Sequence, residues 1–391
     1  MIDFNFVSPT KIFFGREKEK QIGEICKEFN LKKVLLVIGK GSVKKSGLFD
    51  VVTDSLKNSG ISYTLLEGVR PNPEITLCRM GIKFAKDNKV DGIIAVGGGS
   101  VIDTAKSIAA GFYYGGDPFD FNTNEATPKK ALPIGVILTI SASGSESSAS
   151  CVISNDSNNI KQGFNSEVVR PVFAIENPEL TYSVSSYQTA CGTVDIISHS
   201  LERYMNKSDL NNIADEFALG IIKSTVNNGK IAINNPEDYN ARANLMINSS
   251  LSHSGLTGIG KTNMMAMHKM EHAISALHNN IAHGAGLAVV IPIWLNAVID
   301  FELEKIVNLV NYVFDLNLDY TRENAIISVS KFKDFFKEIG MPTSLTELGI
   351  RKDEVVDLVD IMTDYGTRVV GHTVKPLSKD EVMNAMLHYG Y

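Results

Sequence analysis

Short runs of apolar residues alternate with longer segments of mixed polarity through the first half of this 391-residue chain. The run Val34–Ile38 is entirely aliphatic and ends at Gly39, which is typical of a strand buried on both faces. Strand-like runs follow at residues 62–66, 91–96 and 133–138, with helix-like segments at residues 44–58 and 74–88. This alternation predicts a parallel sheet with helices on both faces.

The pattern differs at the start of the chain and again beyond residue 185. Residues 6–14 carry apolar side chains around Pro9, and we expect an edge hairpin there. The second half has few β-branched runs, and its clearest predicted helices cover residues 213–226, 239–251 and 325–339. We therefore predict an α/β domain over residues 1–180 and an all-helical domain over residues 181–391.

Composition and charge argue against several classes of partner. Hydrophobic residues make up 44% of the chain and charged residues 21%, as in a globular protein. The net charge is −6 and no basic face is visible, so we expect no nucleic-acid partner. We find no signal peptide and no apolar run suited to spanning a bilayer, so we expect no membrane partner. Four widely spaced cysteines predict reduced thiols in a cytoplasmic protein: Cys26, Cys78, Cys151 and Cys191.

Two turns after predicted strands are candidate ligand sites. Gly97, Gly98, Gly99 and Ser100 follow a strand and open a helix. Glycines allow positive φ and close approach of a phosphate, and the helix N-terminus offers free N–H groups, so we predict a pyrophosphate site. The alternative is a tight turn without a ligand, because the motif is neither Gly-x-Gly-x-x-Gly nor a P-loop.

The second turn, at residues 139–146, is rich in serine and follows the strand that ends at Leu138. Its hydroxyls could bind a phosphate, a ribose or a carboxamide, since ligands of open α/β sheets lie beyond the carboxyl ends of strands. Capping of the next helix is the alternative for any one of these hydroxyls.

Four of the eight histidines lie between His268 and His283. Asp195 and His199 are spaced i, i+4 and share one helix face, and His268 and His272 repeat that spacing. Imidazole and carboxylate are preferred ligands of borderline divalent metals. We predict a metal site with an open position for a substrate oxygen, built from Asp195, His199, His268 and His283.

A different metal chemistry fits part of the same segment. His268, Glu271 and His272 match the His-x-x-Glu-His signature of inverted zinc peptidases, in which Glu271 would activate water. This alternative leaves Asp195, His283 and the glycine turn without a role.

Five segments together closely resemble the iron-containing (group III) alcohol dehydrogenases, in particular their butanol dehydrogenase branch. The segments are Pro71–Pro73, Gly97–Lys106, Ser143–Glu146, Gly192–Glu202 and His268–Gly284. The resemblance covers essentially the whole chain. It implies an N-terminal dinucleotide-binding α/β domain, an all-helical metal-binding C-terminal domain, and an active site in the cleft between them.

The resemblance also implies roles for individual residues. The predicted ligands would hold Fe2+, or in some relatives Zn2+, and His272 would lie near substrate and nicotinamide, where we expect it to relay a proton. The cofactor would contact Gly97, Gly98, Gly99, Ser100, Asp103, Thr139, Ser143 and Lys161.

Cofactor preference is predicted from the end of the first strand. Relatives that prefer NAD carry an acidic residue there, which would repel a 2′-phosphate. This chain has Gly39, followed by Lys40, Ser42, Lys44 and Lys45. We therefore predict NADP(H), bound in part by Gly39, Ser42 and Lys45; lysines on a solvated helix face are the alternative.

The expected reaction is the reversible reduction of a small aldehyde such as butyraldehyde to its primary alcohol, catalysed by a homodimer. A polyol or hydroxy-acid dehydrogenase on the same scaffold and a non-enzymatic dinucleotide sensor are the alternatives. The predicted metal tetrad argues against a sensor, because binding alone needs no Lewis acid.

Overall fold

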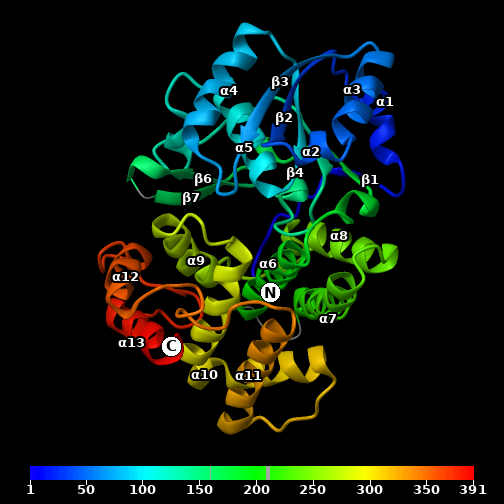
Figure 1. The fold of residues 1–391 in the computed structure, drawn as a ribbon. Helices are drawn as coiled ribbons and strands as arrows, with labels where there is room; N and C mark the ends of the chain where they lie inside the picture. Colours follow the sequence, from blue (N-terminus) through cyan, green and yellow to red (C-terminus); the bar gives the residue numbers. More distant parts are fainter. Residues whose placement is uncertain (159, 208–211) are drawn as a thin grey trace. The chain divides into compact units, whose positions relative to one another are not determined.

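The computed structural model describes residues 1–158, 160–207 and 212–391, which divide into two compact units. Residues 8–183 form an α/β unit (Figure 1). Residues 184–391 form a helical unit, to which the first seven residues also belong.

A six-stranded, fully parallel sheet forms the centre of the α/β unit, in the order β1-β8-β5-β4-β2-β3. Its strands are β1 Lys11–Phe14, β2 Lys33–Gly39, β3 Ser62–Val69, β4 Gly92–Gly97, β5 Ile134–Leu138 and β8 Phe173–Glu176. The predicted parallel sheet is confirmed. A separate antiparallel hairpin, β6 Ser150–Asn155 with β7 Ile160–Asn165, was not predicted.

Alternate side chains of the central strands are buried on opposite faces of this sheet. Val34, Leu36 and Ile38 of β2 pack in one core with α1 Ile22–Glu28 and α3 Leu48–Asn58. Leu35 and Val37 point to the other face and are equally buried. Figure 1 shows α4 Ile75–Asp87 and α5 Gly99–Gly111 on that other face. Burial on both faces explains why these strands read as continuous apolar runs.

The edge hairpin predicted for residues 6–14 is wrong. Only Lys11–Phe14 forms a strand, and it pairs in parallel with Phe173–Glu176. The preceding residues extend into the helical unit, where the Ile2 N–H donates to the Gly260 carbonyl at 3.0 Å. The predicted helix over residues 44–58 is also interrupted, because Gly47 has a φ of 79° between α2 Ser42–Lys45 and α3.

The second unit is helical, as predicted. Its helices are α6 Ser186–Met205, α7 Ile213–Asn234, α8 Tyr239–His253, α9 Ala266–Leu277, α10 His283–Phe314, α11 Arg322–Glu338, α12 Val355–Thr363 and α13 Lys379–Tyr389. By length and composition α10 could cross a bilayer, but 78% of its most apolar window is buried, as expected of a core helix. The apolar core formed around α10 fixes the positions of α6 and α9.

Candidate active site

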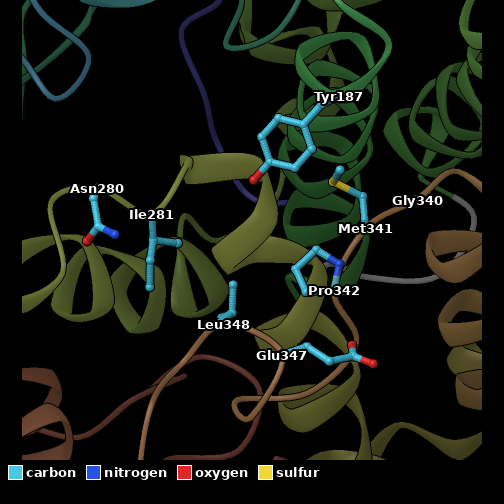
Figure 2. A pocket seen from close by; sticks show the side chains of 8 residues that line it. All are labelled: Tyr187, Asn280, Ile281, Gly340, Met341, Pro342, Glu347 and Leu348. Carbon is cyan, nitrogen blue, oxygen red and sulfur yellow. The ribbon is translucent and has the colours of Figure 1, made fainter.

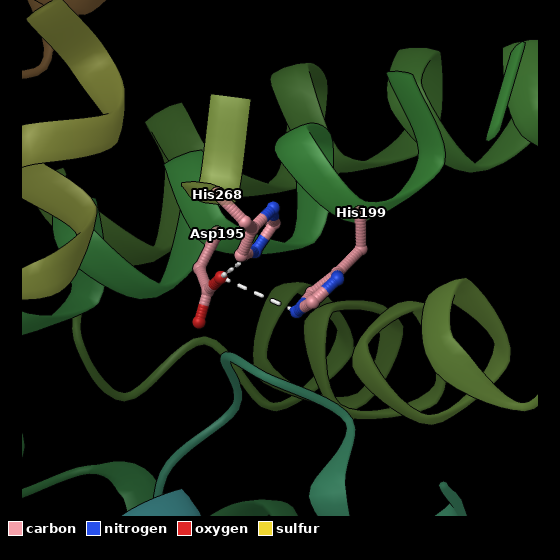
Figure 3. A group of neighbouring side chains, drawn as sticks. All are labelled: Asp195, His199 and His268. Carbon is pink, nitrogen blue, oxygen red and sulfur yellow. Dashed lines mark ion pairs between the residues drawn. The ribbon is translucent and has the colours of Figure 1, made fainter. Parts of the chain in front are cut away.

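Asp195 and His199 project from one face of α6. The Ser185 hydroxyl caps this helix by accepting from the Gln188 N–H at 3.2 Å. The predicted i, i+4 spacing places His199 Nε2 3.4 Å from Asp195 Oδ1 (Figure 3). Both side chains are buried, so the carboxylate lies in a protected environment close to an imidazole.

The other two predicted ligands approach the same carboxylate oxygen. His268 lies on α9 and His283 is the first residue of α10. Their Nε2 atoms are 3.6 and 3.8 Å from Asp195 Oδ1. In a tetrahedral site with bonds of about 2.0–2.2 Å, donor atoms are roughly 3.3–3.6 Å apart. The structure therefore places all three imidazole nitrogens near that spacing from Asp195 Oδ1. Asp195, His199 and His268 are also mutually close, whereas His283 is grouped with Glu271 and His272.

Unpaired buried atoms at this point fit a metal. Asp195 Oδ1 and His268 Nε2 are buried and form no hydrogen bond within the described part of the chain. Buried polar atoms of proteins are nearly always paired. A divalent cation held by one carboxylate and three imidazoles would satisfy both atoms and would retain net positive charge.

Two buried glutamates orient two of the imidazoles. Nδ1 of His268 donates to the Glu202 carboxylate, and Nδ1 of His283 donates to the Glu271 carboxylate. Glu202 and Glu271 are fully buried. Such carboxylate–histidine pairs fix the ring and leave Nε2 for a metal. Neither glutamate was predicted in this role, although Glu202 lies seven residues after Asp195 on the same face of α6.

The role of Glu271 also excludes the peptidase alternative. Its carboxylate accepts from Ser275 as well as from His283. A buried carboxylate with two such partners is not placed to activate a water molecule for peptide hydrolysis.

The electrostatics of the cluster favour a cation beside Asp195. Burial lowers the pKa of His199 well below its ordinary value, and His253 and His268 lower it further. Burial also lowers the pKa of His268, but Glu202 and Asp195 outweigh it and raise this pKa to about 9. A metal would therefore compete with a proton at His268.

Two glycines at the start of α10 allow it to approach the helices that carry the other ligands. A Cβ on Gly284 would lie 2.2 Å from the Cys191 carbonyl oxygen, one turn before Asp195 on α6. A Cβ on Gly286 would lie 2.9 Å from Cγ of Glu271 on α9. The glycines thus permit the close packing that places His283 beside Asp195.

The remaining histidines of the segment occupy different environments. His272 lies near the ligands, with ring centroids 6.3 Å from His268 and 5.8 Å from His283. It groups with Glu271 and His283 and not with Asp195. His278 ends α9, and its Nε2 is 3.6 Å from a Glu354 oxygen.

The predicted cofactor residues lie at the carboxyl ends of neighbouring strands. The chain runs from β2 outward to β3 and then returns to β4 on the other side of β2, so the order of the sheet reverses between β2 and β4. Ligands of open α/β sheets bind at such a point. Gly39 ends β2 and Gly97 ends β4, while Thr139 follows β5 and donates its N–H to the Gly97 carbonyl at 3.1 Å. The turns that follow β2, β4 and β5 thus lie together at the carboxyl-end edge of the sheet.

The three glycines of the β4–α5 turn are needed for space and not for unusual backbone angles. None of Gly97, Gly98 and Gly99 has a positive φ, so that part of the prediction is wrong. A Cβ on Gly98 would lie 2.3 Å from Ile140, and one on Gly99 would lie 2.5 Å from the Ser143 hydroxyl. Their small size therefore keeps the two ligand-binding turns in contact.

A buried ionic network connects α5 with the serine-rich turn. The Asp103 carboxylate accepts from the Ser145 hydroxyl at 2.6 Å and from the Val152 N–H at 3.1 Å. The fully buried Lys106 donates to the Ser145 hydroxyl and to the Ser148 and Ser150 carbonyls at 2.7–2.9 Å. Burial raises the pKa of Asp103 and lowers that of Lys106. The Asp103 carboxylate is therefore already bonded to protein groups, Ser145 and Val152. The nearby charge of Lys161 offsets part of the rise in its pKa.

The turn after β2 offers both a neutral position and exposed cations. Gly39 has space for a side chain, since an added Cβ would meet only the Val69 carbonyl oxygen at 3.6 Å. Ser42 and Lys45 are exposed, as is Lys40. Lys44 forms an ion pair with Glu67, which reduces its charge toward a ligand.

A separate cavity of about 530 Å³ opens in the helical unit (Figure 2). Tyr187 of α6, Ile281 before α10, and Met341 after α11 contribute to its wall. Its lining contains none of the predicted metal ligands, although Ile281 is two residues from His283.

Comparisons with known proteins agree with this arrangement. The sequence model described as "Iron-containing alcohol dehydrogenase" matches residues 9–178, and that of "Fe-containing alcohol dehydrogenase family, C-terminal" matches residues 189–388. The chain is 39% identical over 390 residues to NADH-dependent butanol dehydrogenase A of Clostridium acetobutylicum, with 98% of each chain covered. It is 34% identical over 374 residues to NADPH-dependent aldehyde reductase YqhD of Escherichia coli, with 95% of each covered.

A solved structure is similar over its full length. The crystal structure of NADH-dependent butanol dehydrogenase A from Thermotoga maritima superimposes with a TM-score of 0.96 at 35% identity. The match covers 100% of this chain and 99% of that one.

Proposed function

From its membership of the iron-containing alcohol dehydrogenase family, to which this chain belongs, we propose that it interconverts a primary alcohol and its aldehyde with NADP(H). The enzyme is an oxidoreductase of the alcohol dehydrogenase and aldehyde reductase type. The observation that carries the proposal is the convergence of three imidazole nitrogens on one oxygen of Asp195.

We propose Fe2+ as the metal, with Zn2+ as the competitor that binds such a ligand set more tightly. When bound, the metal supplies a Lewis acid for the substrate oxygen and the nicotinamide supplies the hydride carrier. The protein's own contribution is to hold Asp195 and three imidazoles in place, with Glu202 and Glu271 accepting from Nδ1 of His268 and His283.

The reaction is tested with metal-stripped protein that is reloaded anaerobically with Fe2+ or Zn2+. We expect butyraldehyde to cause metal-dependent loss of NADPH absorbance. No oxidation of either NADPH or NADH with either metal would contradict the proposal and would direct the search to polyols and hydroxy acids.

His272 is the proposed proton relay, because an imidazole titrates near neutral pH and this one lies beside two ligands. Replacing His272 by Ala is expected to lower kcat by about 10²- to 10⁴-fold. Metal content should stay at the wild-type level, and added imidazole should partly restore turnover. Metal analysis is the control, since loss of metal in this variant would make His272 a ligand.

NADP(H) preference is proposed from the residues that follow β2. A neutral Gly39 removes the repulsion that an acidic residue would exert on a 2′-phosphate, and Lys40 and Lys45 are exposed nearby. The names of the relatives point both ways, since the butanol dehydrogenases are called NADH-dependent and YqhD is called NADPH-dependent. Direct measurement of kcat/KM with both cofactors is therefore required.

Replacing Gly39 by Asp should shift that preference toward NADH. A Cβ has room at this position, and the added carboxylate should lower kcat/KM for NADPH by roughly ten- to a hundredfold, which is about 1.4–2.8 kcal/mol. The matched control is Gly39→Ala, which adds the same Cβ without charge and should leave the ratio nearly unchanged. A wild-type preference for NADH, or an equal effect of Ala and Asp, would rule out the proposed role of Gly39.

A homodimer in the cytoplasm also stays a prediction. The support for the homodimer is the edge position of β1 and the exposure of two apolar side chains that precede it in sequence, Phe4 and Phe6.

A further inference from the structure

The three imidazoles of the proposed metal site are not held in the same way. Glu202 orients His268 and Glu271 orients His283 through hydrogen bonds at Nδ1. Nδ1 of His199 is buried and has no hydrogen-bond partner within the described residues. The His199 backbone carbonyl accepts from Arg203 at 3.0 Å, a contact that does not involve the ring. Something other than a carboxylate must therefore set the plane of this ring.

His199 lies between two other imidazole rings. The His253 ring centroid is 4.0 Å away with an interplanar angle of 33°. The His268 centroid is 4.3 Å away with an angle of 28°. Two rings this close and this nearly parallel to His199 cannot share one of its faces, so they cover opposite faces. The rotation of His199 about χ2 is thereby restricted by contact on both sides.

The position of His253 is itself well determined. It is the last residue of α8, whose N-terminus is capped by the Asp238 side chain through the Ala241 N–H at 2.9 Å. Asn248 of α8 donates to the Ser224 and Thr225 hydroxyls of α7 at 2.9 and 3.2 Å. The small buried side chain of Ser252 adjoins His253 at the end of the helix. These contacts attach α8 firmly to the helical unit.

We propose that His253 is a positioning residue for the metal site. Its ring holds the His199 imidazole in the orientation that directs Nε2 toward Asp195, and so replaces by stacking the hydrogen bond that the other two imidazoles receive from glutamate. The inference rests on the proposed function, because it assumes that His199 is a ligand. His253 lies outside the cluster of histidines at residues 268–283, and no spacing in the sequence indicates this role.

Metal affinity is the readout, because activity alone would not separate this role from a role in catalysis. Purified wild-type protein and three variants, His253→Ala, His253→Leu and His253→Phe, are stripped of metal and titrated with Zn2+ against a chromophoric chelator. Co2+-loaded samples are compared by their visible absorption spectra, which report the geometry of the ligand set. His388→Ala, which removes an exposed histidine on α13, is the matched control.

The Ala variant is expected to bind Zn2+ roughly tenfold or more weakly and to release it faster, as for loss of an outer-shell partner. The Phe variant keeps a flat ring and should stay within about threefold of wild type, with an unchanged Co2+ spectrum. Leu keeps volume but not the flat face, and should resemble Ala. If the Ala variant does not fold, the comparison of Phe with Leu decides the question.

Two results would overturn the proposal. Wild-type affinity in Ala and Leu would show that the stacked ring is not needed. Equal loss in Phe and Ala would show that an imidazole nitrogen is needed, as for a ligand.

Failure of wild-type protein to bind a stoichiometric metal would contradict the proposed function itself. Wild-type binding that is lost on Asp195→Asn but kept in His253→Ala would contradict only this inference.

Discussion

A His268→Gln variant is expected to purify without metal and to lose at least about a thousandfold in kcat/KM, since the Lewis acid contributes several kcal/mol. The imidazole Nε2 that faces Asp195 at 3.6 Å is removed, and an amide is a poor replacement ligand. Glutamine still carries an N–H group that can donate to the buried Glu202. The fold should therefore survive, and the loss should be specific to the metal site.

The matched control is His278→Gln, ten residues along the same histidine-rich segment. His278 faces Glu354 and takes no part in the ligand cluster. Its replacement should leave metal content and kcat/KM close to wild type. The two expectations are tested by measuring the metal content of both variants and their steady-state rates after reloading with metal. Equal activity of the two variants would mean that His268 is no ligand.

The second large effect, a loss of folding stability, is expected when Gly284 is replaced. Its substitution by Ala would force a Cβ within 2.6 Å of three backbone atoms of Cys191, and backbone cannot move aside as a flexible side chain can. We expect a loss of about 3 kcal/mol or more in the free energy of unfolding, at the upper end for overpacking. Because α10 would be pushed away from α6, His283 should also lose its place beside Asp195, and metal should be bound more weakly.

Gly220→Ala is the control, because it is expected to increase the free energy of unfolding where Gly284→Ala decreases it. Gly220 lies inside α7, and a Cβ there would meet no atom within 4 Å. Alanine should stabilise this helix by about 0.5–1 kcal/mol, because glycine is a poor helix former. Urea unfolding of the metal-free proteins, followed by circular dichroism, compares the two variants. A Gly284→Ala protein as stable as Gly220→Ala would contradict the packing argument.

Local periodicity was sufficient to predict strands β2, β3, β4 and β5, several helices and half of the proposed metal site. Asp195 and His199 are related by one helical turn, so their neighbourhood follows from sequence spacing alone. The location of His283 against Asp195 follows instead from the packing of α10 on α6; it was predicted from the clustering of histidines and from the family resemblance, not from helical spacing. The contact of Glu202 with His268 joins two helices and has no periodic signal.

Long-range pairing was the main feature that the sequence did not reveal. Lys11 pairs with Phe173, and no local pattern distinguishes this parallel partner from a hairpin. The glycines at positions 97–99 show the same limit. We expected them to allow positive φ and the close approach of a phosphate. None has a positive φ, and Ile140 and Ser143 of the neighbouring turn leave no room for a Cβ on Gly98 or Gly99.

The helical unit contains both the first seven residues and residues 184–391, so the chain leaves it and returns after building the α/β unit. On the ribosome, the α/β sequence emerges in full before most of the helical sequence, so the α/β unit can fold first. The N-terminal segment cannot form its hydrogen bond until Gly260 has been synthesised. An expression tag joined to Met1 would therefore be attached to the helical unit, although it precedes the α/β unit in sequence. A fragment that starts at residue 184 would lack one segment of its own fold.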